Sequence, residues 1–180
     1  MYSIELIRNH SDYVLQDILS VYCSALPKSW HEPNAENYFG EQLYNKNTIH
    51  LLLRREGRPI GYLLAIPHND AVHDNEMKLA DPCLREDSER LYVEAMEILP
   101  EFTRSLVGGK LCLMLLRALH DEAGKREIFK FSMHTRISTG LNQSLRKIYG
   151  DMLTLFRRID NFYFYNCEEP TEYIEGTYRR

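Results

Sequence analysis

A predicted strand, a short loop with paired glycines and a predicted helix follow one another between residues 90 and 123. Residues 90–98 alternate apolar and polar side chains, which is typical of a half-buried strand. Residues 111–119 form a mostly apolar run of helical character, and Gly108 and Gly109 precede it. Unpaired backbone N–H groups at such a helix start point outward and can bind an anion. The succession therefore predicts a loop suited to a phosphate-bearing cofactor.

A second strand is predicted after this helix, which is expected over 109–123. Residues 127–134 alternate again, and Gly124 is the expected end of the helix between the two strands. A strand, a helix and a strand in this order form a βαβ unit, whose two strands run parallel. The chain is therefore predicted to have an α/β fold with parallel strands in its sheet.

The remaining predicted elements show either strand alternation or helical spacing of apolar residues. They are a strand at 3–8, helices at 12–25 and from 33 onward, a hairpin of 50–55 and 59–66, a helix at 141–149, and a closing β-pair of 152–157 and 162–167. Between them, residues 67–89 carry breakers and polar side chains and are predicted to be a long loop with one helical turn, of a kind that often lines a substrate site. Residues 168–180 are predicted to be a polar tail of a single domain spanning 1–180.

The composition and charge of the chain argue against nucleic-acid binding and membrane association. The chain has 180 residues and a formal net charge of −4, from 22 basic and 26 acidic side chains. A duplex nucleic-acid binder usually needs a basic face, so nucleic acid is not expected as a partner. The longest apolar run, residues 111–116, is too short to span a bilayer, and the first residues show no signal-peptide pattern. No membrane association and a cytoplasmic location are therefore expected.

The cysteines and histidines do not show the spacing of a metal site. The cysteines are scattered without a C-x-x-C pair, so they are expected to be reduced thiols: Cys23, Cys83, Cys112 and Cys167. A second group lies in the predicted loop but has no matching distant pair: His68, Asp70, His73 and Asp74. The sequence therefore predicts no metal site.

The order of elements and two motifs resemble the GCN5-related N-acetyltransferases, the GNAT superfamily. That family's acetyl-CoA loop reads Pro-x-x-Arg/Gln-x-x-Gly-x-Gly/Ala, and the ungapped match here runs from Pro100 to Gly108. Thr103 stands where Arg or Gln is usual, and Leu106 where the first glycine is usual. A shift by one residue brings Arg104 and Gly109 to the motif positions and leaves Val107 in place of that glycine. The resemblance implies that acetyl-CoA is bound by Ile98, Thr103, Arg104, Ser105, Val107, Gly108 and Gly109.

The second motif is the family's Asn-x-x-Ala-x-x-Leu-Tyr, which here reads Asn142 to Tyr149 with Leu145 in place of the alanine. The resemblance implies that Asn142 contributes to the cofactor site and that Tyr149 is the general acid for the leaving CoA thiolate. One well-placed phenolic O–H can supply that proton as negative charge develops on sulfur. A tyrosine at the end of an amphipathic helix is otherwise most often a packing residue.

An amine must lose a proton before it can attack a thioester, so the resemblance also requires a base or a water relay. Glu94 and Glu97 lie on the expected strand 90–98, on opposite faces because side chains alternate along a strand. Glu94 is the favoured base, acting through water, and Glu97 is the alternative. His134, at the end of the next strand, is either a further acid–base group or a satisfied polar residue.

The resemblance implies a GNAT-like α/β fold, with a mixed, splayed central sheet and helices on both faces. It implies an N-acetyltransferase that passes an acetyl group from acetyl-CoA to a small-molecule or peptide amine by direct attack. The alternative is a non-catalytic module of the same fold that has kept or lost CoA binding. A different cofactor, such as S-adenosylmethionine, is disfavoured because no early glycine motif is present. Edge strands at 162–167 would be compatible with a homodimer.

Overall fold

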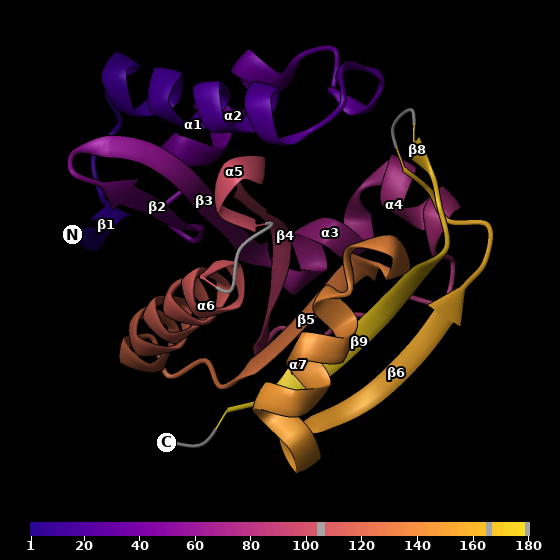
Figure 1. The fold of residues 1–180 in the computed structure, drawn as a ribbon. Helices are drawn as coiled ribbons and strands as arrows, with labels where there is room; N and C mark the ends of the chain where they lie inside the picture. The colour runs from indigo at the N-terminus through magenta and orange to yellow at the C-terminus, as the bar shows by residue number, and fades with distance from the viewer. Residues whose placement is uncertain (104–106, 165–166, 179–180) are drawn as a thin grey trace. The chain divides into compact units, whose positions relative to one another are not determined.

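The protein is a mixed α/β structure, described for residues 1–103, 107–164 and 167–178 of a computed structural model (Figure 1). Its main sheet is seven-stranded, with the order β1-β2-β3-β4-β5-β9-β6, and β7 and β8 form a separate pair. The chain divides into two compact units. Unit 1 contains Met1–Ala65 and Ala95–Glu122, and unit 2 contains Ile66–Glu94 and Ala123–Arg180. The predicted fold class is confirmed.

Unit 1 combines an antiparallel meander with helices. Its elements are β1 (Tyr2–Ile7), α1 (Asp12–Ala25), the short 3-10 helix η1 (Lys28–Trp30), α2 (Ala35–Tyr44), β2 (Ile49–Arg55), most of β3 (Arg58–Pro67), α5 (Pro100–Thr103) and most of α6 (Gly108–Lys125). Both pairs, β1 with β2 and β2 with β3, are antiparallel. Within this unit, α1 and α2 cover one face of the strands and α6 lies on the other (Figure 1).

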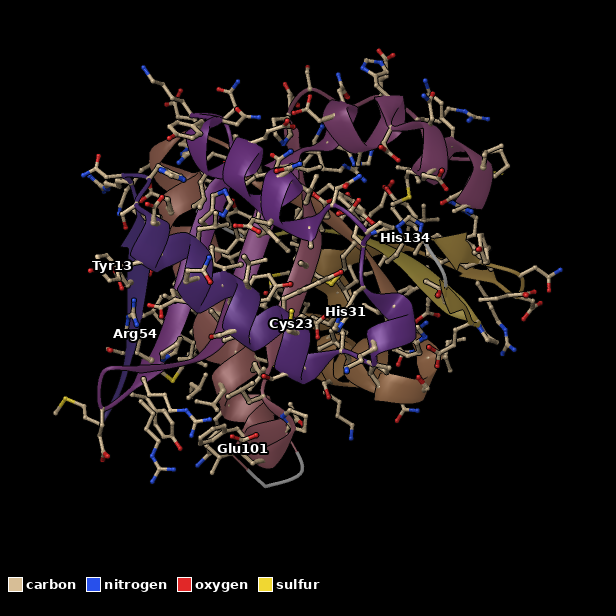
Figure 2. The ribbon with its side chains drawn as sticks, turned by 90° about the horizontal axis from the view of Figure 1, so that it is seen from above. Tyr13, Cys23, His31, Arg54, Glu101 and His134 are labelled. Atoms are coloured by element: carbon tan, nitrogen blue, oxygen red, sulfur yellow. The ribbon has the colours of Figure 1, made fainter. Side chains whose placement is uncertain are left out.

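The predicted elements of unit 1 are confirmed, and the structure shows what begins or ends two of them. Ser11 begins α1 by accepting a hydrogen bond at its Oγ from the backbone N–H of Val14, at 3.3 Å. The face of α1 that points away from the strands is open to solvent, and Tyr13 extends from it away from the protein (Figure 2). At the hairpin, Glu56 and Gly57 both have positive φ, 52° and 85°, as a tight turn between twisted strands requires.

Unit 2 is built around a mixed sheet of β4 (Arg90–Ile98, to Glu94 in this unit), β5 (Lys130–Arg136), β9 (Thr171–Thr177) and β6 (Leu153–Ile159). β4 and β5 are parallel from Arg90↔Lys130 to Val93↔Met133, as the βαβ unit predicted, and β9 is antiparallel to both β5 and β6. The other elements are α3 (His68–His73), α4 (Asn75–Ala80), η2 (Ile137–Thr139), α7 (Leu141–Tyr149), η3 (Gly150–Met152), β7 (Tyr163–Phe164) and β8 (Cys167–Glu168).

The predicted polar tail at 168–180 is wrong, because most of it is the inner strand β9. Tyr173 and Ile174 are buried, and the charges that suggested a tail have partners in the fold. Glu172 pairs with Arg146, and Glu175 pairs with Arg90. The strand also needs Gly176, since a Cβ there would come within 2.7 Å of the Phe131 ring.

The predicted closing β-pair is wrong for a related reason. β6 pairs with β9, and the described strand residues of this range, Tyr163–Phe164 and Cys167, belong to the separate β7–β8 pair. Phe162 is itself buried. The strand at the end of the sheet order in this part of the chain is β6, so the expected edge at 162–167 is not an edge of the main sheet.

Residues 67–89 contain the two short helices α3 and α4 in place of a long loop. Asp74 begins α4 by accepting a hydrogen bond from the N–H of Met77, at 2.8 Å. Apolar residues spaced along these helices are buried: Ala71, Met77 and Ala80. The shortness of each helix hides its periodicity, because one or two turns repeat the pattern too few times to be recognised.

Two element ends also differ from expectation. α6 continues through Gly124 to Lys125, so Gly124 is not its end. The chain reverses instead at Glu127, which has a φ of 58°, while the N–H of Ile128 donates to the carbonyl of Ala123 at 3.0 Å. β5 consequently begins at Lys130.

Candidate functional site

The candidate phosphate loop belongs to unit 1 and starts where β4 ends. The N–H of Leu99 donates to the carbonyl of Ile60 on β3 at 2.9 Å, which holds the start of the loop against the sheet. β3 approaches closely there because Gly61 has no side chain, and a Cβ would lie 2.9 Å from the carbonyl oxygen of Glu97. The side chain of Ile98 is buried. The loop therefore leaves β4 from a rigid point.

The loop contains the one-turn helix α5, which the sequence did not predict. The N–H groups of Phe102 and Thr103 both donate to the carbonyl of Leu99, at 2.9 and 3.3 Å. Thr103 Oγ1 donates to the carbonyl of Pro100, at 3.1 Å, so this hydroxyl is used within α5. Glu101 extends from α5 and pairs with Arg58 of the hairpin (Figure 2). The predicted site residues Arg104 and Ser105, with Leu106, lie outside the described residues.

The start of α6 fits a phosphate group. The first turn of this 18-residue helix contains no acidic side chain. The first backbone N–H groups of any helix lack a carbonyl of an earlier turn of the same helix, and the helix dipole adds positive potential at this end. Val107 accepts at its carbonyl from the N–H of Leu111, at 3.0 Å, so the helical hydrogen-bond pattern begins directly behind the loop.

Gly108 and Gly109 differ in why the fold needs a glycine. A Cβ at Gly108 would lie 2.7 Å from the carbonyl oxygen of Thr103, a backbone atom that cannot rotate away. A Cβ at Gly109 would meet no atom of the described residues within 4 Å. Gly108 is thus required for packing against α5, whereas no atom of the described residues restricts the side of Gly109 on which a Cβ would lie.

This difference predicts opposite results for two alanine variants. Gly108→Ala is expected to lower the unfolding free energy by about 1–3 kcal/mol, the usual cost of overpacking. Gly109→Ala is expected to leave it within about 0.5 kcal/mol of wild type, as for other open sites. Urea unfolding followed by circular dichroism measures both variants. Equal losses of stability in the two variants would contradict the assignment.

In unit 2, the predicted residue Asn142 is held by β9. Its Nδ2 donates to Glu172 Oε2 at 3.1 Å, and its Oδ1 accepts from the N–H of Gln143 at 2.9 Å. Arg146, one turn further along α7, contacts the other oxygen of Glu172 and lies over the ring of Phe156. The amide of Asn142 is therefore oriented by contacts within unit 2 and anchors the start of α7.

Tyr149 is the last residue of α7 and is 6% exposed. Its ring packs against Phe131 of β5, with centroids 5.1 Å apart. The chain turns immediately afterwards at Gly150, which has a φ of 50°. The ring is thus fixed by packing on β5, and the role of its hydroxyl remains a prediction.

The two candidate bases are separated between the units. Glu94 belongs to unit 2, where it shares a face of β4 with Tyr92, and its Oε2 is buried. Glu97 belongs to unit 1. There the pKa of Tyr22 on α1 is raised by burial and, among smaller causes, by the charges of Glu32 and Glu97. The two carboxylates therefore belong to different units and have different neighbours. The choice of Glu94 as the base stays a prediction.

Sequence reasoning missed a buried chain of polar side chains in unit 2. Tyr92 contacts His134, His134 contacts Asp81, and Asp81 is paired with Arg157 of β6. In the sequence, His134 is a single polar residue at the end of a predicted strand, and Asp81 lies within the predicted loop 67–89. The alternating polar positions of β4 and β5 were the available signal, because a regular polar row on a strand needs partners when that face is buried.

Burial and neighbouring charges shift the pKa values of these hydrogen-bonded side chains, and for Asp81 and His134 the two effects oppose each other. Burial alone would raise the pKa of Asp81, but hydrogen bonds from His134 and Arg157 lower it to about 2. Burial lowers the pKa of His134 despite the neighbouring carboxylate. Burial also raises the pKa of Tyr92 well above its usual value, helped by the charge of Glu94. At neutral pH, Asp81 is therefore ionised while His134 and Tyr92 are uncharged.

Across residues 1–103, 107–164 and 167–178, no three His, Cys, Asp or Glu side chains come together as a metal-binding group. His68, one of the possible ligands in the sequence, contacts Ser132 Oγ at 2.8 Å and the carbonyl of Arg85 at 2.9 Å. In the same described part of the chain, no helix is long and apolar enough to cross a membrane.

The seven-stranded mixed sheet and the glycine-led helix after β4 define the class as α/β proteins, and the comparisons with known proteins identify the family within it. The profile of the acetyltransferase (GNAT) family matches residues 15–140. The chain belongs to the acetyltransferase (GNAT) family. The fold of this family binds acetyl-CoA, and one matched structure is a complex with coenzyme A. No curated protein matches the sequence.

Solved structures share the fold at low sequence identity. An aminoglycoside 6′-acetyltransferase type Ii is 12% identical with a TM-score of 0.67, over 100% of this chain and 99% of that one. The ribosomal-protein-S18-alanine N-acetyltransferase from Escherichia coli is 15% identical with a TM-score of 0.63, over 98% and 94%. The PaiA N-acetyltransferase from Thermoplasma acidophilum, in complex with coenzyme A, is 14% identical with a TM-score of 0.57, over 98% and 99%.

Proposed function

We propose that the protein transfers an acetyl group from acetyl-CoA to a primary amine. The observation that carries the proposal is the start of α6, where Gly109 is open, the first turn lacks carboxylates and the loop is anchored to β3. Family membership supports the same donor. The backbone of the loop at Val107, Gly108 and Gly109 would lie against the pyrophosphate, and the backbone at Ile98 would hold the pantetheine arm.

The chemistry requires three proton movements: the amine loses one proton before it attacks and a second once it carries the acetyl group, and the thiolate gains one. Unit 2 contains a candidate for the first and for the last, and the second proton restores the phenol of Tyr149 through water. When bound, acetyl-CoA supplies an acetyl group activated as a thioester. Glu94 removes a proton from the ammonium group of the acceptor through a water molecule, so that the amine has a lone pair with which to attack. Backbone N–H groups of β4 stabilise the negative charge that develops on the carbonyl oxygen. Tyr149 donates its phenolic proton to the departing thiolate.

The acceptor is proposed only as a class, a small-molecule or peptide amine. Two structures of the same fold are named for very different acceptors, an aminoglycoside and the alanine of a ribosomal protein. The second candidate function is a non-catalytic module that binds CoA. The burial of Tyr149 favours it, because an acid must reach the leaving group.

Acetyl-CoA is expected to raise the melting temperature. A ligand at a hundredfold excess over its Kd stabilises the native state by about 2.7 kcal/mol, which corresponds to roughly 5–10 °C for a chain of this size. Differential scanning fluorimetry with acetyl-CoA measures the shift, with adenosine as the control that lacks the pyrophosphate. No shift at millimolar acetyl-CoA would refute the donor. Thiol release with a panel of amines then separates an enzyme from a binding module.

A further inference from the structure

One face of the sheet in unit 2 is both polar and buried. Tyr92 on β4 lies opposite Ser132 on β5, and His134 on β5 lies opposite Tyr173 on β9. All four side chains are at least nine-tenths buried. His68 of α3 covers this face by contacting Ser132, while the other face carries Phe131 and packs against Tyr149 of α7. A polar row in such a position must be internally hydrogen-bonded to be stable.

The hydrogen bonds along this row form a continuous chain from β4 to β6. The hydroxyl of Tyr92 lies 2.8 Å from His134 Nδ1, and His134 Nε2 lies 3.0 Å from Asp81 Oδ2. Arg157 Nη1 and Nη2 donate to the two oxygens of Asp81, at 2.7 and 2.5 Å. The imidazole is also held between the rings of Phe162 and Tyr173, with centroids 4.7 and 4.9 Å away.

The chemistry of these groups determines where each proton lies. The ionised carboxylate of Asp81 only accepts hydrogen bonds, so His134 Nε2 must carry its proton. A neutral imidazole has a single N–H, which leaves Nδ1 as an acceptor. Tyr92 must therefore donate its O–H to His134, and its oxygen lone pairs point away from the imidazole. The direction of every hydrogen bond in the chain follows from the charge on Asp81.

We infer that Asp81, His134 and Tyr92 are positioning residues for Glu94. Together they present the oxygen of Tyr92 as a hydrogen-bond acceptor on the face of β4 that carries the carboxyl group of Glu94. Tyr92 and Glu94 are two residues apart on the strand and so project from the same face. An acceptor beside Glu94 favours its protonated form, which can donate to it, over its charged form. The inference rests on the proposed function, because it assumes that Glu94 is the base.

Other charged and titratable groups on this face do not change the expected effect of Tyr92 on Glu94. They come from every element that packs here in unit 2: Arg90 from β4, Lys130 from β5, Tyr173 and Glu175 from β9, Arg157 from β6, and His68 from α3. Arg90 pairs with Glu175 and Asp87, and Lys130 pairs with Asp87 and Glu89. Arg157 is committed to Asp81. The charges of these groups are thus satisfied locally.

Asp81→Asn tests the inference because it should reverse the direction of the hydrogen bonds between residue 81, His134 and Tyr92. Asp81 Oδ1 accepts from Arg157 Nη1 and from the N–H of Cys83, at 2.7 and 3.1 Å, so the amide oxygen of the variant belongs there. Its NH₂ group then faces His134 Nε2 and Arg157 Nη2, both of which contact Asp81 Oδ2 in wild type. A guanidinium cannot become an acceptor, so Arg157 loses this one hydrogen bond, whereas the imidazole proton can move to Nδ1. The hydroxyl of Tyr92 would then accept from His134 and donate toward Glu94, which favours the charged carboxylate.

Two measurements follow this reversal. The ¹⁵N chemical shifts of His134, assigned with His134→Gln, are expected to show an Nε2-protonated ring in wild type and an Nδ1-protonated ring in Asp81→Asn. The acid limb of the kcat/KM pH profile is expected to move to lower pH by about 0.4–1 unit, the equivalent of one net hydrogen bond. Tyr92→Phe should move the limb in the same direction without changing the imidazole.

The control is Asp87→Asn, which changes a carboxylate that pairs with Arg90 and Lys130 and should alter neither readout. An Nδ1-protonated ring in wild type, or an unchanged acid limb in Tyr92→Phe, would overturn the inference. Absence of acetyl transfer by the wild-type protein would overturn the proposed function, and the ¹⁵N shifts would still report the direction of the hydrogen bonds.

Discussion

Tyr149→Phe is expected to lower kcat by roughly 10²- to 10⁴-fold, the usual contribution of a positioned general acid. The affinity for acetyl-CoA should change little, because the variant keeps the ring that packs against Phe131, at 5.1 Å between centroids. Without the phenolic proton, the thiolate must leave unprotonated or take a proton from water. Steady-state kinetics with saturating acetyl-CoA, together with calorimetric titration of the donor, separates the two effects.

A leaving group of lower pKa provides a second readout for the same variant. The defect of Tyr149→Phe should be smaller with an acetyl donor whose thiolate needs no proton, such as an acetylated aromatic thiol. Tyr13→Phe is the matched control, since Tyr13 is 85% exposed on α1 and belongs to no proposed site. Equal turnover in wild type and Tyr149→Phe would remove Tyr149 from the mechanism and would favour a water as the acid.

Asp81→Ala is expected to lower the unfolding free energy by roughly 3–5 kcal/mol at pH 7, because it leaves Arg157 without its carboxylate and His134 without its acceptor in a buried position. Asp81 is only 1% exposed, so solvent cannot replace the lost contacts. Urea unfolding of the two proteins measures the difference. Asp160→Ala is the control: it removes a carboxylate that is 70% exposed beside Arg158, and should cost at most about 1 kcal/mol.

The pH dependence of this effect follows from the direction of the pKa shift. The folded state lowers the pKa of Asp81 from 3.8 to about 2, so its charged form stabilises the fold fully above pH 3.8. This contribution, roughly 2 kcal/mol for such a shift, is lost as the pH falls through about 2. The difference between wild type and Asp81→Ala should therefore narrow between pH 4 and pH 2. A difference that stays constant over this interval would contradict the pairing.

The elements that could be predicted from the sequence are those whose cause is local. The helical spacing of apolar residues over 12–25 predicts α1, and the two strand-like runs at 50–55 and 59–66 predict the hairpin. The alternating run at 90–98 and the helix after it predict the parallel pair of β4 and β5. Each of these patterns is complete within about 45 neighbouring residues, so it can be read without knowledge of the rest of the fold.

The glycine-led start of α6 is also local, but its two glycines are equivalent in the sequence. Their difference comes from α5, whose carbonyl at Thr103 meets Gly108 and not Gly109. A helix of four residues is too short to be recognised by periodicity, so this contact could not be anticipated. The position that is free for a ligand was therefore visible only after folding.

The amino-acid sequence was sufficient for the family, the order of most elements and the candidate residues Glu94, Asn142 and Tyr149, because helices, turns and short motifs are encoded by neighbouring residues. Tertiary structure was needed to find the partners of the buried polar residues. Asp81 and Arg157 are 76 positions apart, and Glu172 reaches Asn142 across 30. A charged side chain is compatible with a solvated tail or with a buried strand, and what distinguishes the two is an opposite charge that the fold brings from elsewhere in the chain.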